Sequence, residues 1–413
     1  MRKIEYKWVI TGVACFTMLM SSGIRQSFSA FLTPMQTEFG TGRAPLALAM
    51  SLGLLAGALC QPVVGKLSDS LGARRVLAAG CAVTGAGLLA LGFAQSLLIV
   101  YAIFGLVLAI GFSASGVIPN AALVSRWFVE HRAFALSIAS AGFSMGQVVL
   151  LPAAAYLIAL GGWRFAYSSF GVLFIVVVLP IVLLLARDHP GGGIPTGQQA
   201  TVQGTGGLDG FTPMLAAMKT SSFWKLLATF GVCGFTGGLV YTHIIPFAMD
   251  AGVPATEAAN VLAVAGSIGI VGSIALAALS DRVGRKNPLA ALYFMKGFSL
   301  LILALVGGVV AIPIVALTLG MSKGTGALTS ALTGDIYGRN SIGAIYGMAF
   351  LSHEVLASAG SYLGGLAFDL SGTYGPIFLV GAVVGVAGSI VALTISERPA
   401  HLQRPVVAAA ADA

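Results

Sequence analysis

The feature that most restricts the fold of this 413-residue chain is a series of long apolar runs along nearly its whole length. A helix needs about 20 mostly apolar residues to cross the hydrocarbon core of a bilayer. The first run is too long and too polar for a cleaved signal peptide, so we expect it to remain as a span. Twelve segments are long and apolar enough: 8–33, 45–65, 76–95, 97–125, 133–158, 165–186, 222–248, 258–280, 288–306, 308–333, 342–368 and 374–395. The pattern predicts an all-α protein that crosses a membrane many times.

Composition excludes the soluble alternatives. Apolar residues make up 57% of the chain and charged residues 9%, whereas soluble domains carry about 25% charged residues. No soluble core of this size could bury so much apolar surface, so a secreted disulfide scaffold, a disordered chain and a nucleic-acid-binding domain are excluded. The cysteines all lie within apolar runs, where we expect buried free thiols rather than disulfides, at Cys15, Cys60, Cys81 and Cys233.

The basic residues indicate the orientation. With the N-terminus inside, 17 of the 22 Lys and Arg fall on the cytoplasmic side, and Arg43 and Arg164 fall outside. Cytoplasmic loops carry such an excess of basic residues. We therefore expect both termini in the cytoplasm, and the net charge of +8 implies no nucleic-acid partner. Compact loops favour a bacterial inner membrane.

The longest polar stretch divides the spans into six and six. It is rich in Gly, Pro, Thr and Gln without periodicity, which is typical of a flexible linker. We predict an N-terminal six-helix half over 1–186, a cytoplasmic linker over 187–220, a C-terminal six-helix half over 221–397 and a cytoplasmic tail over 398–413.

A short loop pattern follows the second span and returns, partly degraded, 212 residues later after the eighth. The copies read GKLSDSLGARR at 65–75 and LSDRVGRK at 279–286. The first copy resembles the loop signature of the major facilitator superfamily. Duplicated six-span halves with matched loops are typical of many transporters. The resemblance implies twelve transmembrane helices in two pseudo-symmetric six-helix halves. Its conformational loop residues are Gly65, Asp69, Gly72, Arg74, Arg75, Asp281 and Arg285. An aspartate such as Asp69 can accept from the N–H groups of a helix N-terminus.

Two further stretches, 126–146 and 346–365, are similar to the monocarboxylate and oxalate/formate porters of that superfamily. In the oxalate/formate members, span eleven carries a lysine that pairs with substrate, and His353 occupies the matching position here. Those members carry a second basic residue in span eight, which this chain lacks, so the departure counts against a dicarboxylate. Drug/proton antiporters carry an arginine early in span four and a Gly-Pro pair in span five; both are absent here.

Ionisable groups within a bilayer are costly and mark functional sites by default. The resemblance implies that spans one, four, seven and ten line a central cavity, and that spans three, six, nine and twelve are peripheral. The ionisable residues within the spans are Arg25, His243, Lys296, Lys323, His353 and Glu354.

Two of these cations are candidate ligands for an anion. The Arg25 guanidinium could bind a carboxylate through two parallel hydrogen bonds, or form a structural ion pair or carbonyl contact within the bundle. Lys323 lies among glycines that leave room for a ligand, and its structural alternative is a salt bridge to Glu354. Neutral candidates for binding substrate in the same cavity are Asn120, Gln147 and Tyr241.

His353 and Glu354 are candidate proton carriers, because histidine titrates near neutral pH and burial can bring a glutamate into that range. Adjacent residues on a helix point about 100° apart, so we expect the two side chains not to face one spot. A fixed interhelical hydrogen bond is the alternative. His243 is either a gate histidine, with a part in proton coupling, or a packing residue. Lys296, on a peripheral span, is expected to snorkel to the interface.

No phosphate-binding loop, catalytic constellation or metal-ligand spacing occurs in the sequence. We therefore expect no enzyme activity, no cofactor and no metal. Basic groups outnumber the single acid in the spans, which favours a small organic anion with one carboxylate, taken up with a proton by alternating access. The expected partners are that anion, protons and the lipid bilayer, and we expect a monomer.

Other functions stay open. An organic-anion exchanger would differ from such a symporter only in the species that neutralises the buried charge of the cavity. A porter of a neutral or aromatic nutrient, such as a vitamin, would use the aromatic residues Phe28, Phe112, Phe143 and Tyr241. Drug efflux is disfavoured by the absent signatures, and a receptor that binds without transporting is disfavoured by the short linker and tail.

Overall fold

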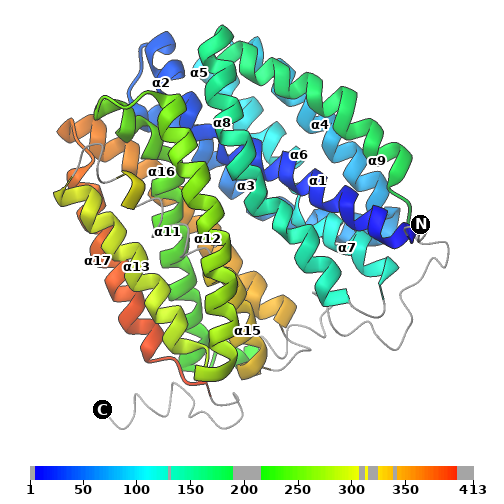
Figure 1. Cartoon of the computed structure of the whole chain (residues 1–413), viewed down its shortest axis with the longest axis vertical. Helices are drawn as coiled ribbons and strands as arrows, with labels where there is room; N and C mark the ends of the chain where they lie inside the picture. Colours follow the sequence, from blue (N-terminus) through cyan, green and yellow to red (C-terminus); the bar gives the residue numbers. More distant parts are fainter. Residues whose placement is uncertain are drawn as a thin grey trace. The chain divides into compact units, whose positions relative to one another are not determined.

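The computed structural model describes residues 5–128, 132–188, 215–306, 312–314, 324–337 and 342–397. Every regular element in these ranges is a helix, which confirms the all-α prediction (Figure 1). In the first half of the sequence the elements are α1 (Tyr6–Gln26), α2 (Phe28–Phe39), α3 (Arg43–Leu71), α4 (Ala73–Gly92), α5 (Leu97–Ala102), η1 (Ile103–Val107), α6 (Leu108–Ser115), α7 (Val117–Trp127), α8 (Arg132–Leu173), η2 (Phe174–Val178) and α9 (Leu179–Leu185). In the second half they are α11 (Ser221–Asp250), α12 (Ala255–Val283), α13 (Lys286–Leu305), α15 (Thr325–Tyr337), α16 (Ile342–Ser371) and α17 (Gly375–Leu393).

Most expected spans correspond to one helix or to a few consecutive helical segments. The expected span 97–125 is built from α5, the π-helical segment η1, α6 and α7. The expected spans 133–158 and 165–186 are separate helical stretches that meet at Gly162, where the backbone is not helical (φ 80°). Only glycine enters that backbone region readily, so Gly162 marks the turn between the two spans. The expected span 308–333 falls partly outside the described residues.

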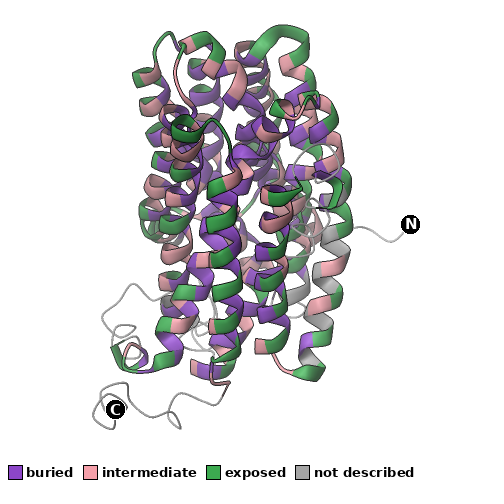
Figure 2. Cartoon of the chain, turned by 90° about the vertical axis from the view of Figure 1, so that its left-hand side faces the viewer, coloured by how far each residue is buried: buried purple, intermediate pink, exposed green. Residues whose placement is uncertain are grey.

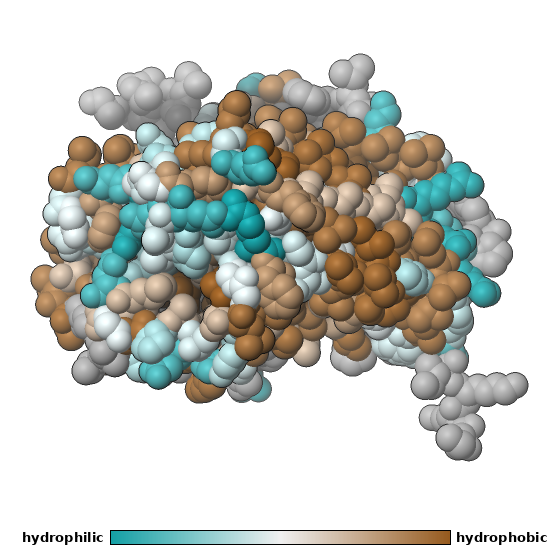
Figure 3. All heavy atoms as spheres, turned by 90° about the horizontal axis from the view of Figure 1, so that it is seen from above, coloured by the Kyte–Doolittle hydropathy of each residue, from teal (hydrophilic) through white to brown (hydrophobic). Residues whose placement is uncertain are grey.

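Length and hydropathy support the membrane assignment. Among the described residues, eight helical stretches are long and apolar enough to cross a bilayer, and one of them, Ala135–Leu185, holds two of the expected spans. Buried and exposed residues alternate along the helices (Figure 2). Large apolar residues lie on the outside of many helices, as the space-filling view shows (Figure 3). Lipid-facing surfaces have this character, whereas large apolar patches are rare on soluble monomers.

The chain divides into two compact units. Unit 1 comprises 1–193, 240–264 and 361–372, and unit 2 comprises 194–239, 265–360 and 373–413. The units therefore do not coincide with the sequence halves, because the ends of α11 and α16 and the start of α12 belong to unit 1.

Within unit 1, glycines bring helix backbones close together. A Cβ on Gly23 of α1 would lie 2.5 Å from the carbonyl oxygen of Gly146 in α8. A Cβ on Gly142, one turn before Gly146, would likewise overlap the Cys15 carbonyl oxygen. Such small residues four apart are the usual device for tight helix contacts in membranes.

Unit 2 repeats this arrangement with its own helices. A Cβ added to Gly234 of α11 would overlap the His353 carbonyl of α16. A Cβ added to Gly360 of α16 would overlap the Phe235 carbonyl of α11. Helices α13 and α17 run side by side (Figure 1), with Gly297 and Gly385 in backbone contact. The corresponding spans of the two sequence halves thus pair in the same way, first with fifth and third with sixth.

The cysteines are free thiols, as expected. Cys81 and Cys233 are buried, but Cys15 and Cys60 are half-buried, which corrects the expectation that all four are enclosed. An apolar run does not reveal which face of its helix is turned outward.

Candidate functional site

Arg25 lies in unit 1, in a small recess between α1, α3 and the segments of span four. The cavity volume is about 10 Å³, room for roughly one water molecule. In the described part of the chain no hydrogen bond or ion pair engages the guanidinium. The recess is lined, beside Arg25, by Met50, Gly53, Leu54, Gly57, Phe104, Ala109 and Phe112. A cation in an apolar surrounding therefore remains available for an anion.

The neutral candidates serve different purposes in unit 1. The Asn120 amide donates to the carbonyls of Ser115 (3.0 Å) and Gly116 (2.8 Å), across the break between α6 and α7, and the residue is fully buried. Its Oδ1 atom has no hydrogen-bond partner among the described atoms. Gln147 is 8% exposed and Tyr241 is half-buried. These three residues do not line the Arg25 recess.

His243 is fully buried in unit 1, where its Nε2 lies 2.7 Å from the carbonyl oxygen of Ser361. The neighbouring Thr242 hydroxyl shares a hydrogen bond with the Ser361 hydroxyl at 2.8 Å. The histidine thus joins α11 to α16, in a place where its ring is enclosed by protein.

His353 and Glu354 lie together in unit 2, contrary to the expectation that they face different ways. His353 Nδ1 lies 3.2 Å from Glu354 Oε1, and the Glu354 side chain is almost enclosed. The 100° helical offset fixes only the Cα–Cβ directions, and the flexible glutamate side chain reaches back to the imidazole. The two candidate proton carriers are therefore in direct contact.

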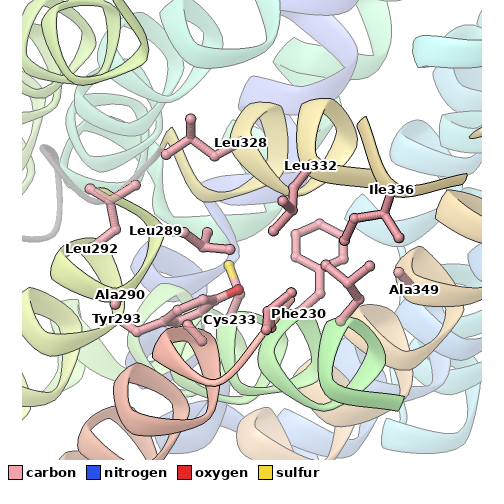
Figure 4. Close-up of a cluster of buried hydrophobic side chains, with 13 residues drawn as sticks. Phe230, Cys233, Leu289, Ala290, Leu292, Tyr293, Leu328, Leu332, Ile336 and Ala349 are labelled. Atoms are coloured by element: carbon pink, nitrogen blue, oxygen red, sulfur yellow. The ribbon is translucent and has the colours of Figure 1, made fainter. Parts of the chain in front are cut away.

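Lys296 does not snorkel to the membrane interface, because it is 7% exposed and its Nζ donates to Cys233 Sγ at 3.0 Å. Cys233 also shares a hydrogen bond of 3.1 Å with the Thr325 hydroxyl, and the His353 side chain interacts electrostatically with the same sulfur. We call Cys233, Lys296, Thr325, His353 and Glu354 the Cys233 cluster. Figure 4 shows the Cys233 sulfur among apolar side chains of unit 2, close to Tyr293.

A second group of charges, the Arg43 cluster, lies in unit 1 at the start of α3. Arg43 binds Asp250 through both terminal nitrogens, at 2.7 and 2.6 Å. The Asp369 carboxylate accepts from the backbone N–H groups of Arg43 (2.8 Å) and Ala44 (2.9 Å). The guanidinium stacks on Phe368 at 3.7 Å. The cluster joins α3 to the ends of α11 and α16.

The loops of the repeated pattern have a common geometry. Gly72 (φ 92°) and Gly284 (φ 87°) each precede a helix, α4 and α13 respectively. Asp188 accepts from the backbone N–H of Arg74 at 3.4 Å, and Glu397 accepts from the backbone N–H groups that open α13, at 2.6 and 2.9 Å. Carboxylates are stabilising at helix N-termini.

The acceptor expected at such a site was Asp69, whose side chain, like that of Asp281, lies outside the described atoms. The sequence signal for the observed acceptors is their place: Asp188 and Glu397 follow the sixth and twelfth spans, 209 residues apart. Basic residues complete both loops. Arg126 lies 3.3 Å from Asp188, and Arg285 lies 3.1 Å from Asp335. Gly65, Arg74 and Arg75 flank the first loop, and Lys323 lies outside the described residues.

Asp188→Ala is expected to lower the stability of unit 1 by about 1 kcal/mol, because the start of α4 loses an acceptor and Arg126 loses its ion pair. The measurement is the apparent melting temperature of the purified protein. Glu257→Ala, which removes an exposed carboxylate from the first turn of α12, serves as the control. Equal melting temperatures for the two variants would contradict a capping role for Asp188.

The comparisons agree with this architecture. A family model described as Major Facilitator Superfamily matches residues 14–359. Among solved structures, a bacterial homologue of the human lysosomal transporter Spinster, in an inward-facing and unoccupied conformation, superposes with a TM-score of 0.71 at 16% identity, covering 94% of this chain and 95% of that one. This likeness supports the fold.

Curated relatives cover nearly the whole chain. The uncharacterised MFS-type transporter YcxA of Bacillus subtilis is 29% identical, over 92% of this chain and 93% of that protein. Monocarboxylate transporter 12-B of Danio rerio is 25% identical, over 94% and 87% respectively. The oxalate:formate antiporter of Oxalobacter formigenes is 25% identical, over 97% and 93%. The matching proteins are transporters and not enzymes. This chain is accordingly a multi-pass membrane transporter that belongs to the major facilitator superfamily.

Proposed function

We propose that the transporter carries a small organic anion with one carboxylate, together with a proton, across the cytoplasmic membrane by alternating access. The observation that supports this most is Arg25, a cation within a span that has no bound acceptor among the described residues. A cation within a membrane span favours an anion nearby, and Arg25 is half-buried. Two of the relatives are named a monocarboxylate transporter and an oxalate:formate antiporter, which favours a carboxylate.

In this proposal the carboxylate neutralises the Arg25 guanidinium through paired hydrogen bonds, which are strong when both partners are charged. The proton binds at His353, whose imidazole lies against the Glu354 carboxylate. Because the anion and the proton together carry no net charge, the loaded protein can rearrange without moving charge through the hydrocarbon. Lys323, Asn120, Gln147 and Tyr241 remain candidates for further substrate contacts, and His243 for proton coupling.

The proposal includes the organisation expected from the sequence. The two six-helix halves, 1–186 and 221–397, are joined by the linker 187–220 and rock around a site at the midplane, and the loops around Asp69 and Asp281 guide that movement. The chain is a monomer in an inner membrane with both termini, including the tail 398–413, in the cytoplasm.

Anion exchange is the second candidate, since a relative is named an antiporter. An exchanger would neutralise Arg25 with one anion or another at all times and would need no proton. Uptake that responds to anions trapped inside liposomes, but not to a pH gradient, would favour exchange.

Arg25→Gln is expected to reduce uptake of a transported monocarboxylate by at least about a hundredfold, because a charge-assisted pair worth about 3 kcal/mol is lost. The assay uses purified protein in liposomes with an alkaline interior and a radiolabelled panel of lactate, pyruvate, oxalate, an aromatic acid and riboflavin. Arg25→Lys should retain part of the activity, since it keeps the charge but not the paired geometry.

The matched control is Lys219→Gln, which removes an exposed cation near the linker and should leave uptake unchanged. Normal uptake by a folded Arg25→Gln protein would refute the role of Arg25. Transport of riboflavin but of no acid by the wild-type protein would refute the anion assignment.

A further inference from the structure

The Cys233 cluster places four ionisable side chains from three helices in one enclosed part of unit 2. Cys233 comes from α11, Lys296 from α13, and His353 and Glu354 from α16. Cys233 and Lys296 are each 7% exposed and Glu354 is 3% exposed. The sequence alone gives no reason to connect Cys233 or Lys296 with the His353–Glu354 pair.

The sulfur is the link between the two ends of the cluster. Lys296 Nζ lies 3.0 Å from Cys233 Sγ, the His353 side chain interacts electrostatically with the same sulfur, and His353 Nδ1 lies 3.2 Å from Glu354 Oε1. The Thr325 hydroxyl completes the surroundings of the sulfur at 3.1 Å. The sulfur therefore lies between Lys296 on one side and the His353–Glu354 pair on the other.

Aromatic rings pack against the imidazole of His353, whose side chain is 23% exposed. The centroids of Phe230 and Phe350 lie 4.9 and 5.7 Å from that of His353. Among the described residues, the other titratable groups facing the sulfur are the phenols of Tyr293 and Tyr346, and Tyr346 donates to the Gly326 carbonyl at 3.3 Å. Low exposure strengthens the interactions between charges in the cluster.

The net charge of the cluster is zero when Cys233 and His353 share one titratable proton. With Lys296 protonated and Glu354 ionised, a thiol beside a neutral imidazole and a thiolate beside an imidazolium both give zero net charge. A second proton converts the pair into a thiol and an imidazolium and leaves a net charge of +1. A buried net charge is costly, so this second proton is released readily unless an anion enters the protein.

We propose that the Cys233 cluster is the binding site of the transported proton, with Cys233 and His353 as its acceptors and Lys296 as the fixed charge that makes its binding reversible. This inference rests on the proposed proton symport, and it assigns roles to Cys233 and Lys296 that the proposed function does not need. The proton reaches the Cys233–His353 pair when substrate binds and leaves it when substrate is released, so no covalent bond between heavy atoms changes.

Lys296→Met tests the inference because it removes the fixed charge at nearly constant side-chain length. The protonated cluster then has zero net charge and retains its proton. The curve of uptake against pH should move to higher pH by at least about one unit, and accumulation driven by a pH gradient should fall about tenfold. Exchange of labelled for unlabelled substrate at equal pH should stay within about twofold, because no net proton movement is needed.

Four variants make the result specific. Lys296→Arg keeps the charge and should restore much of the gradient-driven accumulation. Lys225→Met removes a half-buried lysine of α11 that donates to the Thr394 carbonyl and should leave the pH curve in place. Cys233→Ser should shift the pH curve, whereas Cys81→Ser, at a buried cysteine of α4, should not.

An unchanged pH curve in Lys296→Met would overturn the inference. Loss of exchange together with accumulation, in a protein that remains monodisperse, would also overturn it and would assign Lys296 to substrate binding or to packing. Failure of the wild-type protein to respond to a pH gradient would instead refute proton symport itself.

A spectroscopic measurement covers the case in which the variants do not transport. The infrared S–H band of Cys233, identified by its absence in Cys233→Ser, should change with pH in the wild-type protein in parallel with an imidazole band. Lys296→Met should displace that titration. An S–H band that is constant over the pH range of transport would overturn the inference independently of any transport assay.

Discussion

Alanine at Gly23 or Gly360 is expected to lower the apparent melting temperature of the purified protein by about 5 °C and to reduce its yield. The new Cβ of Gly23→Ala would lie 2.5 Å from the Gly146 carbonyl oxygen, and that of Gly360→Ala would lie on the Phe235 carbonyl. Both obstacles are backbone atoms of a neighbouring helix, so a side-chain rotation cannot relieve them. Overpacking of this kind costs about 1–3 kcal/mol, and each kcal/mol corresponds to about 2–4 °C in a domain of this size.

The same two helices supply matched controls. Gly12 of α1 and Gly347 of α16 are exposed, and a Cβ added to either would meet no atom of a neighbouring element within 4 Å. Because alanine favours a helix over glycine by about 1 kcal/mol, Gly12→Ala and Gly347→Ala should match or exceed the wild-type melting temperature. Equal destabilisation by all four substitutions would show that helix propensity, and not backbone contact, determines the effect.

The membrane architecture was predictable because it depends on local properties of the sequence. The length of each apolar run sets a span, and the repeated loop pattern indicates the duplication. Even the turn between the fifth and sixth spans coincides with a glycine, Gly162. The breaks within spans are harder to recognise in the sequence. For example, α1 ends before Ser27, and α2 follows it and extends the first expected span to Phe39.

The candidate site was only partly predictable, because hydropathy gives the length of a helix and not its rotation about its axis. Lys296 belongs to the same buried stripe of α13 as Tyr293 and Leu300, whereas its span was expected to be peripheral. Cys233 was interpreted as a plain buried thiol, since its apolar neighbours in sequence say nothing about the lysine across the helix interface.

Pairings over long sequence distances were not visible at all. Arg43 was assigned to an outside loop, but it begins α3 and contacts Asp250 and Asp369, which are 207 and 326 residues away. No periodicity or spacing argument connects such positions. Only the fold brings the three charges together. We expect their contacts to control how often the joined helix ends separate.

Arg43→Gln is expected to increase the labelling rate of a cysteine placed at Ala47 by about tenfold. Ala47 is fully buried in α3, one turn after Arg43, and its carbonyl accepts a hydrogen bond from Ser361 at 3.4 Å. The variant loses the bidentate pair with Asp250 and the stacking on Phe368. A loss of about 1.4 kcal/mol in the closed arrangement raises the open population about tenfold.

This experiment connects the Arg43 cluster to the proposed transport cycle. Alternating access requires helices from the two sequence halves to separate and rejoin at their ends, and the cluster joins α3 to α11 and α16. The protein is placed in nanodiscs, so that a membrane-impermeant maleimide reaches both sides, and the wild-type cysteines set the background. Asp250→Asn should give a similar increase in the rate of labelling.

The control distinguishes a contact that holds the closed arrangement from a general destabilisation of unit 1. Arg164 pairs with Glu38 and donates to the Ala94 carbonyl at 2.6 Å, and these contacts stay within the first six spans. Arg164→Gln removes a comparable ion pair, yet it should leave labelling at Ala47→Cys within about twofold, because exposed pairs contribute about 1 kcal/mol or less. Equal acceleration by Arg164→Gln and Arg43→Gln would mean that the cysteine reports local loosening of unit 1. Acceleration by Arg43→Gln alone, enhanced further when substrate is added, would identify the Arg43 cluster as a contact that opens during transport.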